Sequence, residues 1–320
     1  MKAPVIYDRI MKNGESRAQT GYLFPYHIAA FPRSAYETDT VRNNRMECEK
    51  SRECGSRIKQ GGFTMKEMQQ DSSTIAWNAM GDEWFELAQT GEARNCFIMP
   101  NMLKFMGDVN SKRILDLGCG EGGYSRELAR RGAQLVSVDC SRKAIEYAAK
   151  LAEEEKLTIE HYVRNSNDLF DIDAEQFDIV LCSMMLMDCE DFDGTLSEAV
   201  RVLKPGGCLF ASVLHPCFDG NHETGIGRQG TGIDREVVVK NYFEPKEWEA
   251  PLWGGNIPVI WRHRTMEDYV KAFIRAGLTI ADLNEPRATD EQAERSVGLA
   301  WLRKIPLYLY WKLIKQCRDS

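Results

Sequence analysis

The stretch Ile114-Leu115-Asp116-Leu117-Gly118-Cys119-Gly120-Glu121-Gly122-Gly123 decides how this chain is interpreted. It predicts a buried strand that runs into a glycine-rich turn and then into a helix. A second predicted strand, 134–139, follows and ends on the carboxylate of Asp139. Glycines let a backbone approach a ligand closely, because a Cβ would clash there. An acid about 20 residues after the first glycine is placed to bind the ribose diol in a nucleotide-binding βαβ unit. The stretch therefore predicts an adenosine-containing cofactor.

The position of Asp116 bears on which cofactor this is. Gly118, Gly120 and Gly123 also satisfy the dinucleotide fingerprint, which is a weak signal when it stands alone. Asp116 precedes the first glycine by two residues, where its carboxylate would repel the pyrophosphate of a dinucleotide. A cationic ligand would be attracted instead. The alternative is a glycine turn that binds no ligand.

Four segments in a fixed order carry a resemblance to a known family. They are Ile114 to Gly123, Val138-Asp139, Phe177-Asp178-Ile179-Val180 and Val202-Leu203-Lys204-Pro205-Gly206-Gly207. In this order the sequence resembles the class I S-adenosylmethionine-dependent methyltransferases over most of residues 112–214. The resemblance implies S-adenosyl-L-methionine as cofactor and methyl transfer as the reaction. It also implies a final strand that enters the sheet antiparallel, between strands six and five.

The hydrophobic pattern alternates between strands and helices along the chain. Such alternation predicts an α/β fold with a doubly wound, mostly parallel sheet of seven strands, and ligands at the carboxyl ends of the strands. The expected strands are 113–117, 134–139, 159–163, 177–182, 207–214, 278–283 and 306–311. The expected helices are 95–107, 122–131, 141–155, 192–203, 265–276 and 290–303. Ser141 is the expected N-cap of one helix, and Thr265 with Asp268 forms a capping box for another.

Residues 1–64 show no sustained period and are expected to be a poorly ordered extension, the alternative being a flap over the active site. The methyltransferase domain is expected to span 65–320, with order beginning near Ser73 as the N-cap of a first helix. A segment of about 50 residues, 215–263, interrupts the alternation after the fifth strand. It contains a glycine-rich loop at 216–232 and two β-like runs, 236–243 and 257–261. Its position predicts a cover over the substrate.

Charge and composition limit the partners. Residues 1–64 carry 11 Lys/Arg and 7 Asp/Glu, whereas the other 256 residues carry 30 and 41, a net charge of −11. An acidic body argues against nucleic acid as a partner and favours a small-molecule substrate. No apolar run reaches the roughly 18 residues of a membrane span, and the chain start lacks a signal-peptide core. None of the 10 cysteines forms a C-x-x-C pair, so we expect a reduced, cytoplasmic protein without disulfides or a metal site.

The cofactor-binding residues follow from the motif and from the resemblance. Asp116 is expected to reach the ammonium of the methionine moiety, and Asp139 the ribose hydroxyls. The resemblance places Asn165 and Ser166 beside the adenine, where the family usually has Asp and a small residue. It places Ser183 and Met184, which follow the fourth strand, beside the methionine moiety. The expected set is Asp116, Gly118, Cys119, Gly120, Gly122, Asp139, Cys140, Asn165, Ser166, Ser183 and Met184.

The acceptor side rests on the insertion and on the ends of the strands. His215 follows the fifth strand and His263 lies just after the second β-like run, and each is a candidate general base with an ordinary pKa near about 6.5. Either histidine is alternatively structural. The candidate substrate-binding residues are Tyr242, Phe243, Trp261 and Asp188. The aromatic residues are equally suited to form the core of the insertion, and Asp188 is equally suited to cap the next helix.

The sequence therefore predicts an S-adenosylmethionine-dependent methyltransferase that acts on a small molecule. The alternatives are an RNA or tRNA methyltransferase and a catalytically silent cofactor-binding protein. An Asn-Pro-Pro-Tyr type motif after the fourth strand would favour RNA, but the chain has Cys182-Ser183-Met184-Met185 there. The sequence identifies neither the acceptor atom nor the oligomeric state.

Overall fold

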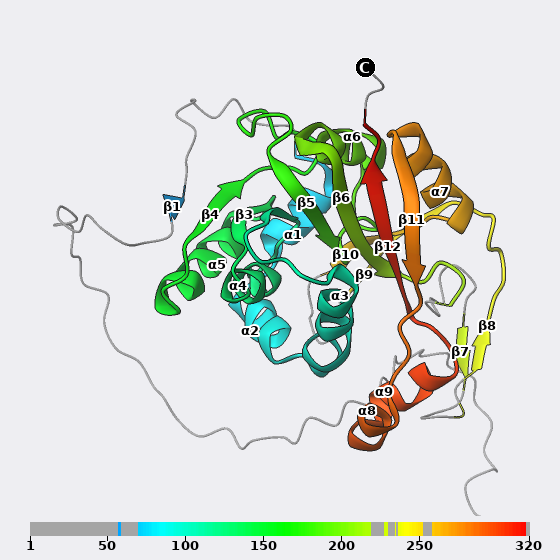
Figure 1. The fold of residues 1–320 in the computed structure, drawn as a ribbon. Helices are drawn as coiled ribbons and strands as arrows, with labels where there is room; N and C mark the ends of the chain where they lie inside the picture. Colours follow the sequence, from blue (N-terminus) through cyan, green and yellow to red (C-terminus); the bar gives the residue numbers. More distant parts are fainter. Residues whose placement is uncertain are drawn as a thin grey trace, which may run out of the picture. The chain divides into compact units, whose positions relative to one another are not determined.

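The computed structural model describes residues 57–58, 70–218, 227–229, 234, 236–251 and 258–317, all within the unit Lys50–Ser320. A single eight-stranded sheet of order β1-β4-β3-β2-β5-β6-β12-β11 organises these residues (Figure 1). The strands are β1 (Arg57–Ile58), β4 (Ile159–Val163), β3 (Gln134–Asp139), β2 (Arg113–Leu117), β5 (Phe177–Ser183), β6 (Leu203–Leu214), β12 (Tyr308–Lys315) and β11 (Leu278–Asn284). Without the two-residue β1, this is the expected sheet of seven strands.

The strand directions agree with the expected topology. Strands β4, β3, β2, β5 and β6 run parallel to one another. Strand β12, red in Figure 1, lies antiparallel between β6 and β11. The prediction of a last strand inserted between the fifth and sixth is therefore confirmed. Because β2 and β5 are neighbours in the middle of the sheet, their carboxyl ends lie side by side.

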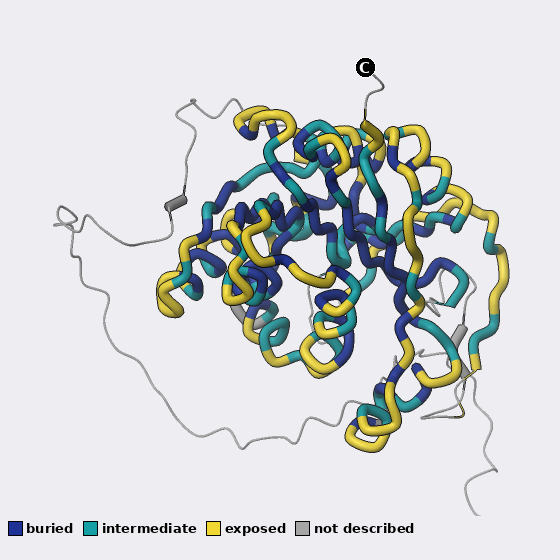
Figure 2. The backbone as a smooth tube through the Cα atoms, viewed as in Figure 1, coloured by how far each residue is buried: buried dark blue, intermediate teal, exposed yellow. Residues whose placement is uncertain are grey.

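Helices cover both faces of the sheet. Ile114 of β2 belongs to one hydrophobic cluster with helices α3 (Met99–Met106) and α4 (Gly123–Arg130). Leu115, the next residue, belongs to a second cluster with α6 (Phe192–Val202) and α7 (Met266–Arg275). This alternation is the two-residue period of a strand buried on both faces. Figure 2 shows the central strands buried and β11 exposed along much of its length.

The predicted caps are confirmed at two helices. Ser141 caps α5 (Arg142–Glu154) by accepting the Ala144 amide. Thr265 and Asp268 form the capping box of α7.

Three predicted helices differ from the structure. The N-cap of the first helix, α1 (Ser72–Ala79), is Asp71 and not Ser73, and a break at Met80-Gly81 separates it from α2 (Asp82–Thr90). The single helix expected at 290–303 is three short pieces: α8 (Asp290–Arg295), α9 (Val297–Ala300) and a 3₁₀ turn, Trp301–Arg303. The expected helix 95–107 begins as a π-helical turn, Arg94–Ile98, and continues as α3.

The insertion contains a β-hairpin of which only one strand was predicted. Strand β10 (Pro258–His263) pairs antiparallel with β9 (Lys246–Pro251), a strand that was not predicted. Of the expected run 236–243, only β8 (Glu236–Val238) is a strand, and it pairs with β7 (Gly227–Gln229). Most of the expected loop 216–232 lies outside the described residues.

The predicted extension also lies almost entirely outside the described residues. Within it, β1 pairs parallel with Glu160-His161 of β4 and continues the sheet. In the part of the chain that the structure describes, we find no helix with the length and apolar character of a bilayer span.

Candidate active site

The glycine turn between β2 and α4 has a backbone that only glycine adopts without strain. Gly118, Gly120 and Gly122 have φ angles of 73°, 55° and 77°. A Cβ on Gly118 would lie 2.8 Å from the side chain of Met185, and one on Gly122 would lie 2.9 Å from Ala148. A Cβ on Gly120 would meet no protein atom within 4 Å. The turn is thus packed at both ends and open at its middle glycine, where a ligand can lie against the backbone.

Asp116 places a carboxyl group in the protein interior beneath this turn. Its side chain is 2% exposed, and its Oδ2 accepts a hydrogen bond of 2.5 Å from the Ser125 hydroxyl. The Ser137 hydroxyl in turn donates to Ser125 at 2.7 Å. Burial raises the pKa of Asp116 to about 7, and the Ser125 hydrogen bond opposes that rise. A cationic ligand beside this carboxylate would favour its charged form.

Asp139 ties the glycine turn to the start of α5. Its Oδ2 accepts the Gly120 amide at 2.9 Å, and its Oδ1 accepts the Ser141 amide at 2.8 Å. Burial raises the pKa of Asp139, and these two backbone hydrogen bonds oppose the rise. A carboxylate has about four lone-pair positions, so each oxygen retains the capacity to accept a further hydrogen bond.

Helix α1 lies against the residues expected beside the adenine. The Asn165 amide donates to Asp71 at 2.9 Å and to Thr74 at 3.1 Å. Burial raises the pKa of the nearby Cys140 thiol, and Thr74 opposes that rise. Ser166 hydrogen-bonds to Thr195 of α6 at 2.8 Å. Asp71 and Thr74 had no predicted role, although an Asp-Ser-Ser start is itself a helix N-terminus signal that could have located Asp71.

The carboxyl end of β5 turns sharply toward the glycine turn. The Ser183 hydroxyl lies 3.0 Å from that of Ser212, and the Met184 amide donates to the Ser212 carbonyl at 2.8 Å. Met184 has a φ of 57°, which is uncommon for a residue with a side chain. The following residue, Met185, packs on Gly118. Residues 184–190 therefore form a turn that borders both the glycine turn and the end of β6.

Asp188 in this turn carries a buried carboxyl group. Its side chain is 9% exposed, and among the described residues none donates a hydrogen bond to its carboxylate. Burial raises its pKa to about 7, and the charges of Arg262 and Arg264 oppose the rise. The Asp188 oxygens are not among the fully buried side-chain atoms without a partner, so water or a ligand can reach them. Carboxyl groups with a pKa raised by burial concentrate at functional sites.

His215 already has a hydrogen bond at each ring nitrogen. Its Nδ1 accepts the Cys217 amide at 3.1 Å, and its Nε2 lies 2.9 Å from a carboxylate oxygen of Glu285. The proton is therefore on Nε2, which donates to Glu285. Burial lowers the pKa of His215, and Glu285 opposes the fall. His215 joins the end of β6 to the segment after β11.

His263 and Tyr242 fix the hairpin to α7. His263 Nε2 donates to the Tyr242 carbonyl at 2.8 Å, and the Tyr242 hydroxyl accepts the Met266 amide at 2.8 Å. Burial raises the pKa of Tyr242 to about 12. Phe243 is 81% exposed. The structure thus brings His263 and Tyr242 together.

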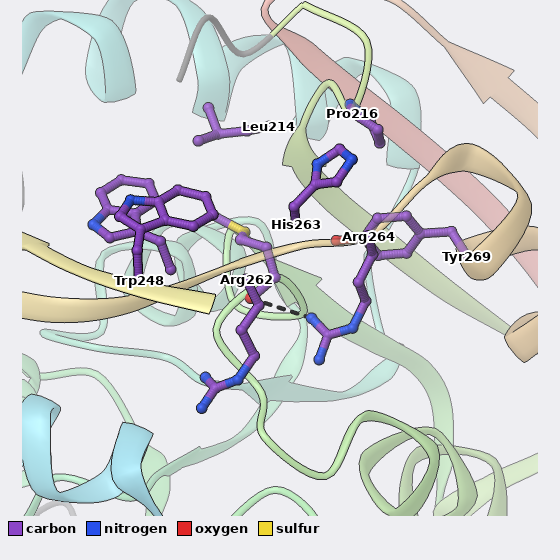
Figure 3. A pocket seen from close by; sticks show the side chains of 9 residues that line it. Leu214, Pro216, Trp248, Arg262, His263, Arg264 and Tyr269 are labelled. Carbon is purple, nitrogen blue, oxygen red and sulfur yellow. Dashed lines mark hydrogen bonds between the residues drawn. The ribbon is translucent and has the colours of Figure 1, made fainter. Parts of the chain in front are cut away.

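The hairpin has an aromatic core of its own. Trp261 stacks on Trp248 at 6.3 Å between ring centroids, with an angle of 8° between the planes. The Trp261 indole donates to the Ala250 carbonyl at 3.1 Å. The space beneath the hairpin is a cavity of about 20 Å³. Figure 3 shows its lining, which consists of Met187, Leu214, Pro216, Trp248, Trp261, Arg262, His263, Arg264 and Tyr269.

Comparison with known proteins shows which proteins this chain resembles in sequence and in fold. Residues 115–211 match the methyltransferase domain family. The chain is 29% identical over 171 residues to a ubiquinone biosynthesis O-methyltransferase of Coxiella burnetii, covering 52% of this chain and 72% of that protein. It is 26% identical to an S-adenosylmethionine-dependent methyltransferase of Mesorhizobium loti, whose crystal structure superposes with a TM-score of 0.55 over 68% of this chain and 95% of that one.

The chain is a class I S-adenosylmethionine-dependent methyltransferase. The residues at the carboxyl ends of β2 and β3 fit its cofactor. The open side of Gly120 offers a backbone surface, Asp116 offers a buried negative charge, and Asp139 offers free acceptor positions. The surface at Gly120 suits a ligand that lies along the turn. The charge of Asp116 suits a cationic group, and the acceptor positions of Asp139 suit a pair of hydroxyls.

Proposed function

We propose that this methyltransferase transfers the methyl group of its cofactor to a hydroxyl of a small molecule. The small molecule is held between the turn 184–190 and the β9–β10 hairpin. The observation that carries the proposal is the buried carboxyl group of Asp188. It lies in the turn that packs on the glycine loop, so it is close to the strand ends where the methyl group is presented. The Coxiella burnetii relative, named as an O-methyltransferase, supports oxygen as the acceptor atom.

The cofactor side of the proposal assigns one group to each part of the ligand. Asp116 binds the ammonium and Asp139 binds the ribose hydroxyls. Asn165 has its amide nitrogen held by α1, so its oxygen faces no competing donor from that helix and accepts from the adenine amine. Ser166, Cys119 and Cys140 border the base and ribose, while Ser183 and Met184 border the methionine moiety.

Bound S-adenosylmethionine supplies an electrophilic methyl group on a sulfonium. The protein then has to orient the acceptor oxygen in line with that methyl group and exclude water. Asp188 accepts the proton of the acceptor hydroxyl as the new O–CH₃ bond forms and the S–CH₃ bond breaks. A pKa near 7 lets this carboxyl be ionised at neutral pH and still hold a proton.

The two histidines are weaker candidates for this proton transfer. The lone pair of His215 Nδ1 is occupied by the Cys217 amide, and its Nε2 proton by Glu285. His263 donates its Nε2 proton to a carbonyl and retains only Nδ1. We therefore propose that His215 and His263 hold the acceptor side together, and that Trp261, Tyr242 and Phe243 belong to the cover that closes over it.

A small acceptor and a cytoplasmic location fit the charge and the cysteines. The net charge of −11 on residues 65–320 opposes binding to a polyanion. The eight cysteines within the described part of the chain are all free thiols, as in a reducing compartment.

The direct test uses cofactor with a deuterated methyl group. The full chain is incubated with it and with either a low-molecular-mass metabolite fraction or an RNA fraction of the same cells, and products are detected by mass spectrometry. We expect deuterated methyl groups in the low-mass fraction, on oxygen. Label found in the RNA fraction alone would contradict the proposal.

Asp188→Asn tests the assigned base. It should lower turnover of the acceptor by about a hundredfold or more, within the range for general base catalysis. Its affinity for S-adenosylhomocysteine should stay within about threefold of the parent. Asp193→Asn, which alters an exposed carboxylate on α6, is the matched control and should retain parental turnover. If Asp188→Asn turns over the acceptor at the parental rate with the parental pH profile, Asp188 is not the base.

A further inference from the structure

Arg262 on β10 joins three segments that are far apart in the sequence. Its Nη1 donates to the Ser73 hydroxyl at 2.7 Å and to the Asp188 carbonyl at 2.6 Å, and its Nη2 donates to the Ser72 hydroxyl at 2.7 Å. Its Nε lies 2.8 Å from a carboxylate oxygen of Glu247 on β9. The guanidinium therefore holds α1, the turn 184–190 and the hairpin together. Its side chain is only 7% exposed.

Arg264 makes a different set of contacts. Its guanidinium donates to the carbonyls of Leu186, Met187 and Cys189, all in the turn, and lies over the ring of Phe192. Figure 3 shows the side chains of Arg262 and Arg264 on the side of the strand away from His263. Arg264 thus links the hairpin to the turn, whereas Arg262 also links it to α1.

Helix α1 has a second contact, with the cofactor side. Asp71 and Thr74 hydrogen-bond to Asn165, and Thr74 lies near Cys140. Asn165 and Cys140 follow strands β4 and β3, where the adenosine is assigned. Ser72 and Ser73, between Asp71 and Thr74 in the first turn of α1, are the residues that meet Arg262. One helical turn therefore contacts both the cofactor side and the hairpin.

The hairpin must lift for an acceptor to enter. The cavity beneath it, about 20 Å³, has room for about one water molecule and is too small for an acceptor molecule. Lifting β10 separates Arg262 from Ser72, Ser73 and the Asp188 carbonyl. Closing the hairpin restores these contacts only if the first turn of α1 is in place.

We propose that Arg262 is a positioning residue that couples the cofactor site to the closed hairpin through the first turn of α1. A bound cofactor orders α1 against Asn165, and the ordered turn presents Ser72 and Ser73 to Arg262. The hairpin then closes over the acceptor, so the cofactor binds first. This inference rests on the proposed function, because it takes the hairpin as the cover of the acceptor.

The geometry requires arginine at this position. The guanidinium serves acceptors on three segments at once, and it does so with donors in a fixed plane. A lysine ammonium is a single point with three donors on a flexible stem, so Arg262→Lys keeps the charge but not the simultaneous contacts.

Hydrogen exchange on the full chain, with and without S-adenosylhomocysteine, measures the coupling directly. In the parent, the ligand should slow exchange both in α1 and in peptides from 246–251 and 258–263. In Arg262→Gln the ligand should bind within about threefold of the parental affinity and still protect α1. It should no longer protect the hairpin peptides.

Two further variants make the result specific. Ser72→Ala combined with Ser73→Ala leaves β10 intact. It removes the two hydroxyls that accept from Arg262, together with their own hydrogen bonds to Glu190 and to the Asp188 carbonyl, so it should also lose hairpin protection. Arg275→Gln removes an exposed arginine that pairs with Asp193, and it should keep the parental pattern. If the ligand protects the hairpin equally in the parent, in Arg262→Gln and in the serine variant, the coupling does not exist.

The readout separates this inference from the proposed function. Exchange needs only S-adenosylhomocysteine, so hairpin protection can be lost in Arg262→Gln whatever the acceptor is. Failure to find a low-mass acceptor would overturn the proposed function and leave the exchange result in place. If the ligand protects the hairpin from exchange equally in the parent and in Arg262→Gln, the coupling is wrong and the proposed methyl transfer is unaffected.

Discussion

Asp116 should make the cofactor affinity of this methyltransferase depend on pH. Without ligand, burial raises its pKa to about 7. A bound ammonium group attracts the carboxylate form, so binding requires that Asp116 lose its proton. About nine tenths of the ligand-free protein is ionised at Asp116 at pH 8 and about one tenth at pH 6. Affinity for S-adenosylhomocysteine should therefore fall about tenfold from pH 8 to pH 6, which is about 1.4 kcal/mol.

Calorimetry measures both the affinity and the proton. At pH 7, binding should release about half a proton, so the observed heat should differ between buffers of different ionisation enthalpy. Asp116→Asn should bind weakly at every pH and lose this buffer dependence. Asp188→Asn is the matched control, since its carboxyl also has a pKa of about 7 but is assigned to the acceptor. It should keep the pH dependence of cofactor affinity.

The same pKa has a consequence for the stability of the ligand-free protein. The pKa of Asp116 is raised on folding, from 3.8 to about 7, so its protonated form stabilises the fold at low pH. That contribution is lost as pH rises through about 7. Relative to the parent, Asp116→Asn should therefore gain stability between pH 5 and pH 7 and keep that gain unchanged above about pH 8.

A parent whose affinity for S-adenosylhomocysteine is flat from pH 6 to pH 8 would refute this account of Asp116.

Three other changes have expected outcomes. Gly118→Ala should destabilise the fold by roughly 1–2 kcal/mol in thermal melts, because φ is 73° and Met185 occupies the space of a Cβ; an unchanged melting temperature would contradict this. Trp261→Ala removes half of the hairpin's stacked pair, so cofactor affinity should stay within about threefold while acceptor turnover falls on the order of a hundredfold. A chain beginning at Met65 should melt cooperatively and bind S-adenosylhomocysteine like the full chain, and lost affinity would show that residues 1–64 contribute to the site.

Much of the fold was predictable because its signals are local. The strands around the glycine turn alternate between two buried faces, and the helix caps Ser141 and Thr265 act within four residues of themselves. Asp116 and Asp139 were predictable for the same reason, since each ends or nearly ends a strand beside the turn. The inserted last strand was implied by the resemblance to the class I methyltransferases and not by a local signal.

The acceptor side was less predictable because it depends on contacts between distant segments. Strand β9 was missed, since half of its sequence Lys-Glu-Trp-Glu-Ala-Pro is charged and its partner is needed to show that Trp248 faces inward. The sequence gives no sign that Arg262 meets α1, which is about 190 residues away. The hydrogen bonds that occupy both nitrogens of His215 also come from the folded arrangement, because Glu285 belongs to the segment after β11.

The most direct test of the assigned site is a calorimetric titration of the full chain with S-adenosylhomocysteine, repeated for Asp139→Ala and with NADH. The parent should bind S-adenosylhomocysteine and give no heat with NADH. Asp139→Ala should weaken binding by roughly 1.5–3 kcal/mol, the range for hydrogen bonds to a charged group, while the exposed control Asp193→Asn binds like the parent. NADH that competes for the site, or an Asp139→Ala variant with parental affinity, would contradict the account.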